Sequence, residues 1–155
     1  MISRRTWLAR TGGAALLVIA GRRLDAAALV AKPSIVVYKD PGCGCCNAWV
    51  DHLKASGFDV QAHNDTGMDE RKGLMGVPVA LRSCHTAQTG AYVIEGHVPA
   101  ADIKRALAGH PRILGLAVPG MPMSAPGMSQ PGARKVPYEV IAFEKGGRTT
   151  VYSRY

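Results

Sequence analysis

Three of the four cysteines in this 155-residue chain lie within four positions, in "DPGCGCCNAW". They are Cys43, Cys45 and Cys46, and the fourth cysteine is Cys84. Cys43 and Cys46 form a C-x-x-C pair, a spacing found both in redox-active disulfides and in metal sites. Two thiolates at this spacing suit Cu(I) or Zn, and three crowded thiolates suit Cu(I). The cluster therefore indicates a metal site or a redox couple. A structural disulfide with one spare thiol is the alternative.

Four further residues offer donor atoms that match a soft metal ion. His85 directly follows Cys84, and His97 ends the strand that is expected to return toward the cysteine cluster. Met121 and Met123 lie in "PGMPMSAPGM", and thioether sulfur combined with thiolate selects Cu(I) over harder ions. His97 is expected to be a ligand or to support one, whereas the alternative role of the methionines is loop packing. The remaining histidines are interpreted as surface or packing residues: His52, His63 and His110.

Residues 1–28 have the pattern of an export signal. Arg4 and Arg5 precede a short apolar core at 14–20, and the alanines at 26–28 offer a cleavage site. The core is too short for a membrane span, which needs roughly 20 apolar residues. Ser3–Leu8 resembles a twin-arginine signal, with Trp7 where Phe is usual. We expect cleavage near 28–31, export to the bacterial periplasm and no stable membrane span afterwards. A membrane-anchored or disordered N-terminus is the alternative.

The charge distribution argues against a nucleic-acid partner. The chain carries a formal net charge of +8, but residues 1–28 hold five arginines against one aspartate. The rest has 14 basic and 10 acidic residues, so its net charge is only +4. It contains no run of Lys and Arg and no aromatic stripe of the kind that binds nucleic acid. Residues 32–155 are expected to form one domain.

Hydrophobic periodicity predicts an α/β fold with the order β-α-β-α-β-β-α. The C-x-x-C pair would lie where the first strand meets the first helix, and Val77-Pro78 would open the third strand, as in the thioredoxin-like layout. The expected strands are 34–40, 58–64, 77–84 and 90–97, with a turn-rich segment at 85–90. The expected helices are 45–56, a short one within 66–76, and 99–109.

Two features follow this core. Residues 111–131 are rich in proline, glycine and methionine, so they are expected to form a loop that lies against another part of the protein or acts as a mobile flap. Two alternating runs around Lys145-Gly146-Gly147 predict a C-terminal β-hairpin. The predicted third strand also raises a geometric conflict. Six extended residues after Pro78 would carry Cys84 roughly 20 Å from the other cysteines, unless the strand bends or ends early.

Four segments together resemble a known family. They are "VYKDPGCGCCNAWVDHL", "GVPVALRSCHTA", "YVIEGHVPAADI" and "GLAVPGMPMSAPGM", and they occur in this order across nearly all of 34–152. They resemble the bacterial periplasmic metal-binding proteins related to the copper-resistance protein CopG, long catalogued as a domain of unknown function. The resemblance implies a thioredoxin-like fold and a role in copper tolerance.

The resemblance also implies roles for individual residues. Cys43, Cys45 and Cys46 would form a sulfur cluster that binds copper as Cu(I), in one or several ions, with Cys84 as a further sulfur. The implied accessory ligands are His85, His97, Met121 and Met123. The expected function is a binding protein that sequesters copper or passes it to another periplasmic copper protein. An enzyme that is a thiol–disulfide oxidoreductase or a Cu(II) reductase is the alternative, and a disulfide-stapled binding module without metal is the third possibility.

Overall fold

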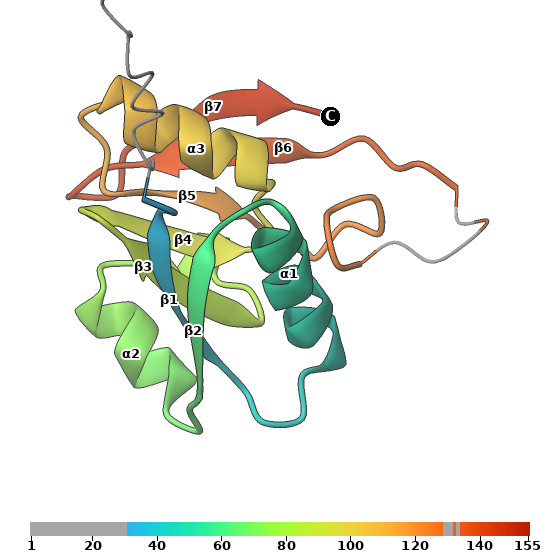
Figure 1. Ribbon diagram of the computed structural model, residues 1–155. Coiled ribbons are helices and arrows are strands. Elements are labelled where there is room, and N and C mark those ends of the chain that lie inside the picture. Colours follow the sequence, from blue (N-terminus) through green and yellow to red (C-terminus); the bar gives the residue numbers. More distant parts are fainter. Residues whose placement is uncertain (1–30, 129–131, 133) are drawn as a thin grey trace, which may run out of the picture. The chain divides into compact units, whose positions relative to one another are not determined.

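The computed structural model describes residues 31–128, 132 and 134–155, and it forms a mixed α/β domain. The described residues form one seven-stranded sheet and three α-helices. Figure 1 shows the helices packed around this sheet. The elements are β1 (Ser34–Lys39), α1 (Gly44–Ala55), β2 (Asp59–Asn64), α2 (Met68–Leu74), a 3₁₀ turn η1 (Val79–Leu81), β3 (His85–Thr89), β4 (Tyr92–Gly96), α3 (Ala100–Gly109), β5 (Gly115–Val118), β6 (Glu139–Phe143) and β7 (Thr149–Arg154).

The sheet is mixed, with the strand order β2-β1-β3-β4-β5-β6-β7. β1 pairs with β2 in parallel and β4 pairs with β5 in parallel, whereas the other neighbours are antiparallel. Trp49 of α1 and Ile103 of α3 pack in one core cluster with Ile94 of β4. The preceding residue of the same strand, Val93, packs with Leu81 in a second cluster. Because successive side chains of a strand point to opposite faces, α1 and α3 cover one face and the segment around η1 covers the other.

The predicted third strand is wrong in position. Residues 79–81 form η1, and the strand that pairs with β1 starts only at His85, in the segment expected to be a turn. Val77 and Leu81 are buried whereas Val79, between them, is 78% exposed. A strand would place all three side chains on one face, so this burial pattern fits a helical turn. The hairpin turn is shorter than expected, at residues 90–91 between β3 and β4.

The segment 111–131, expected to be a loop throughout, contains the short strand β5 between β4 and β6. Gly115 permits this pairing, because a Cβ atom there would lie 2.0 Å from the carbonyl oxygen of Val93. Residues 119–128 contain no helix or strand, as expected. The C-terminal hairpin is confirmed by the antiparallel pairing of β6 with β7.

The mixed α/β class and the element order β-α-β-α-β-β-α along residues 34–109 are found in the structure. The more specific thioredoxin-like assignment stays a prediction. The expected export signal at 1–28 lies outside the described residues. Within the described part of the chain, none of the helices has the length and apolar character needed to cross a membrane.

Candidate metal centre

The four cysteine sulfurs converge at one end of the β1–β3 pair. Cys43 is the N-cap of α1, and Cys45 and Cys46 lie in its first turn. Cys84 directly precedes β3, and the register pairs Lys39 at the end of β1 with His85 at the start of β3. The Cys45 Sγ atom lies 3.5 Å from the Cys43 Sγ atom and 3.9 Å from the Cys84 Sγ atom. The separation of roughly 20 Å that a straight strand would give does not occur, because the chain before Cys84 turns through η1 instead of extending.

The four cysteines are not chemically equivalent. Cys43 and Cys46 form a disulfide, whereas Cys45 and Cys84 are free thiols. Cys46 is fully buried, and its sulfur lies 3.8 Å from the Cys84 carbonyl oxygen. Thiolates, not disulfide sulfurs, are the strong metal ligands, so reduction of this disulfide would be needed to supply all four sulfurs as ligands.

Two imidazoles complete the group around Cys84. The Cys84 sulfur lies 3.2 Å from His85 Nδ1 and 3.2 Å from His97 Nε2. His97 Nδ1 lies 2.8 Å from the Pro126 carbonyl oxygen, which can only accept, so Nδ1 carries the proton and donates. This hydrogen bond leaves the Nε2 lone pair directed at the sulfur, the arrangement that is usual behind metal-binding histidines. Cys84 thus belongs both to the four-cysteine group and to a Cys84–His85–His97 group.

Burial controls protonation in this group. It lowers the pKa of His85 well below its ordinary value, with further lowering by the charges of His97 and Lys72. Burial also lowers the pKa of His97. Both imidazoles are therefore neutral at neutral pH, the form that binds metals. Burial, followed by the nearby Cys45, raises the pKa of the Cys84 thiol to about 11. A bound cation would reverse this preference and favour the thiolate.

Contacts beyond the donors hold the two imidazoles in place. The centroid of the Trp49 ring lies 4.3 Å from the centroid of the His85 ring. The Trp49 indole N–H donates to the Val98 carbonyl oxygen at 2.9 Å. A Cβ atom on Gly127 would lie 2.6 Å from the Trp49 backbone nitrogen, so this loop lies directly on α1. The loop can therefore present the Pro126 carbonyl to His97. The spacing of Cys46, Trp49, Val50 and Leu53 fits one apolar face of the helix expected at 45–56, so Trp49 could be anticipated there. Pro126 could not be anticipated, since a backbone carbonyl has no side-chain signature.

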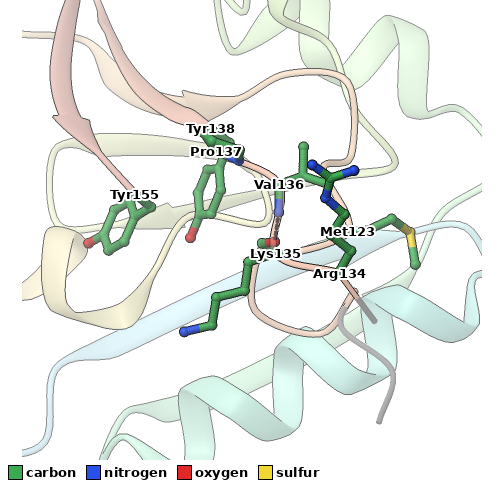
Figure 2. Close-up of a pocket in the computed structure, with 8 residues that line it drawn as sticks. Met123, Arg134, Lys135, Val136, Pro137, Tyr138 and Tyr155 are labelled. Carbon is green, nitrogen blue, oxygen red and sulfur yellow. Dashed lines mark hydrogen bonds between the residues drawn. The ribbon is translucent and has the colours of Figure 1, made fainter. Parts of the chain in front are cut away.

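Met121 and Met123 lie at the surface, with 44% and 41% of their area exposed. Met123 borders a cavity of about 500 Å³. Figure 2 shows the stacked Tyr138 and Tyr155 rings on one side of this cavity and Lys135 beside them. Ligation by either methionine stays a prediction. Met128, from the same loop, packs against the main core.

The other histidines have surface or packing roles, as expected. His52 Nε2 accepts a hydrogen bond from the Ala100 backbone N–H at 3.2 Å, at the start of α3. His63 is exposed and stacks on Tyr38, and His110 is the C-cap of α3.

The donor set fits a soft metal ion, and comparisons with known proteins agree with this chemistry. Residues 81–128 match a family model described as "Protein of unknown function, DUF411". No curated protein sequence gives a significant match. Two solved structures, described as "Copper resistance protein copG", forms 2 and 1, are similar to the chain at 41% and 42% sequence identity. Each match covers 80% of this chain and 98% of the solved chain, with a TM-score of 0.75. On this identity and coverage, the chain belongs to the family of the copper resistance protein CopG.

Proposed function

We propose that the protein binds copper as Cu(I) in the periplasm and contributes to copper tolerance. One observation carries this proposal: four cysteine sulfurs lie within 4.8 Å of one another, and two histidines share one of them. Sulfur-rich sites with imidazole support favour soft ions such as Cu(I). Membership of a family whose solved relatives are called copper resistance proteins supports copper as the ion.

The spacing of the sulfurs supports a site that can hold more than one Cu(I) ion. The Cys45 sulfur lies between those of Cys43 and Cys84, at 3.5 and 3.9 Å. A thiolate in this central position can bridge two ions, each of which also binds an outer sulfur. The full sulfur set requires a thiol reductant, which gives two electrons and two protons to the Cys43–Cys46 disulfide and is itself oxidised to a disulfide. The thiol protons are then lost to the solvent when copper binds.

The sequence pattern supports the cellular setting of the proposal. The twin-arginine-like segment at 3–8 supports export, and it would allow folding before export. A thioredoxin-like fold would place the C-x-x-C pair at the start of α1, where the cysteines are observed. In the periplasm the protein would sequester Cu(I) or pass it to another copper protein.

The test is a metal and thiol count on the anaerobically reduced protein. Loading with Cu(I) is expected to give at least one bound ion per chain and to protect the thiols from alkylation. The Cys45→Ser variant is expected to bind fewer ions, whereas His63→Gln, on exposed β2, serves as a control that binds as many as the wild type. A reduced wild-type protein that holds less than one ion per chain would contradict the proposal.

A thiol–disulfide oxidoreductase or Cu(II) reductase is the second candidate, because Cys43 and Cys46 form a disulfide at the N-terminus of a helix. Cys43 is partly exposed and Cys46 is buried, which suits an attacking and a resolving thiol. The neighbouring Cys45 argues against a simple two-cysteine cycle, since it can form mixed pairings. Insulin reduction at a thioredoxin-like rate, without stable copper binding, would favour this candidate.

A further inference from the structure

Lys72 and Glu95 form a buried ion pair beside the metal centre. Lys72 Nζ donates to Glu95 Oε1 at 2.5 Å, and the two side chains are only 3% and 0% exposed. Lys72 belongs to α2 and Glu95 to β4. The desolvation cost of burying two charges often offsets their attraction. Stability alone is therefore a weak reason for a charged pair at this place.

The same carboxylate oxygen also holds the chain next to the site. The backbone N–H of Ser83 donates to Glu95 Oε1 at 2.5 Å. Ser83 lies between η1 and β3, so its N–H is outside the regular pairing of the sheet. The peptide that leads into Cys84 is thus fixed by a side chain from β4.

A second contact, from Gly96 next to Glu95, also holds Ser83 in place. A Cβ atom on Gly96 would lie 2.8 Å from the Cβ and Oγ atoms of Ser83, so Ser83 packs directly on the Gly96 backbone. Glu95 and Gly96 together hold Ser83, and the next residue of each segment supplies a donor atom. These donors are the Cys84 sulfur and His97 Nε2, which lie 3.2 Å apart.

We propose that Glu95 is a positioning residue of the metal centre. Its carboxylate fixes the Ser83 peptide and so directs the Cys84 sulfur toward His97. Lys72 balances the buried charge of that carboxylate, a role that a neutral Gln side chain does not need. The expected effect on Cu(I) affinity rests on the proposed function. The orientation of Cys84 is independent of that function and can be measured without metal.

Two double variants separate positioning from simple loss of the ion pair. Lys72→Met with Glu95→Gln removes both charges but keeps an oxygen that can accept from Ser83. Lys72→Met with Glu95→Met removes both charges and the acceptor at similar volume. In a Cys45→Ser background with the Cys43–Cys46 disulfide intact, Cys84 is the single free thiol. We expect Cys84 to react with iodoacetamide several-fold faster in the Met/Met variant than in the Met/Gln variant.

Cu(I) affinity is measured on the same two double variants, with Cys45 present. The Met/Met variant is expected to lose Cu(I) affinity by roughly 10- to 100-fold, the usual effect of removing support behind a ligand, whereas the Met/Gln variant stays close to wild type. Equal alkylation rates in the two variants would overturn the positioning role, whatever the copper result.

Two precautions keep the test decisive. If the Met/Met variant does not fold, Glu95→Asp replaces it, since the shorter side chain keeps the charge but withdraws the acceptor from Ser83. An unchanged alkylation rate in Glu95→Asp would then overturn the proposal. If the wild type fails to bind Cu(I), the proposed function fails, while the alkylation rates still decide whether Glu95 orients Cys84.

Discussion

Cys84 and His97 lie directly opposite each other across the β3–β4 hairpin, just beyond the last paired residues. The register pairs Thr86 with Glu95, and two steps further along both segments it reaches Cys84 and His97. Their donor atoms lie 3.2 Å apart. The tight turn at residues 90–91 sets this register, because the loop length of a hairpin fixes which residues face each other. Hairpin geometry thus brings a thiol and an imidazole together.

Replacing His97 should weaken copper binding without unfolding the protein. In His97→Gln the imidazole nitrogen that faces Cys84 is lost, while the amide can still donate to the Pro126 carbonyl oxygen. We expect Cu(I) affinity to fall by roughly 10- to 100-fold, as measured by competition with a chromophoric Cu(I) chelator. His63→Gln, on the exposed face of β2, is the matched control. Equal affinities for the two variants would exclude His97 from the metal centre.

Gly127 should tolerate a side chain less well than Gly120. Both have positive φ angles, +81° and +74°, so alanine is strained at each by roughly 1–2 kcal/mol. At Gly127 the added Cβ would also meet the Trp49 backbone nitrogen at 2.6 Å, whereas at Gly120 it has no neighbour within 4 Å. Overpacking should make Gly127→Ala about 1–3 kcal/mol more destabilising than Gly120→Ala in urea unfolding. Equal losses would mean that the loop moves freely off α1.

Met121 and Met123 should contribute to copper affinity. Replacing both by leucine conserves volume but removes the thioether donors, so Cu(I) affinity should fall while the free energy of unfolding stays within about 1.5 kcal/mol of wild type. Met68→Leu with Met75→Leu, at the two ends of α2, is the control pair. Unchanged affinity in a competition titration would reduce Met121 and Met123 to surface residues of the loop.

Tyr138 should give the protein an alkaline limit of stability. Burial, followed by the charges of Tyr155 and Asp102, raises the pKa of Tyr138 from its ordinary value of 10 to about 12. The unfolded chain therefore releases this proton first, so the stabilising contribution is complete below pH 10 and is lost between pH 10 and 12. Denaturant midpoints should fall across this range and fall less in Tyr138→Phe. Parallel declines in the two proteins would assign the effect to other groups.

Much of the fold follows from local sequence pattern. Periodicity correctly predicted three elements. They are the β-branched strand at 34–39, the helix in which Cys46, Trp49, Val50 and Leu53 share one face, and the helix at 100–109. Two elements did not follow. A strand was expected at 77–84 because apolar residues alternate there. Val77 and Leu81 are also four residues apart, a spacing that fits one face of a helical turn equally well. β5 was not predicted because its four residues, which lie between Pro111 and Pro119, are too few to show a hydrophobic period. Pairing with β4 and β6 decides their structure.

The sequence by itself determined the chemistry of this protein: three clustered cysteines, a Cys-His pair and a C-x-x-C motif at the start of a helix. Residue types and short spacings carry that information directly. Residue spacing left open whether Cys84 reaches the cluster, and the tertiary structure decided it, because this depends on the register of β1 with β3 and on η1. It also decided the support given by Pro126 and by the Lys72–Glu95 pair. These contacts join residues far apart in the chain, through a backbone carbonyl and a buried side chain that sequence pattern does not reveal.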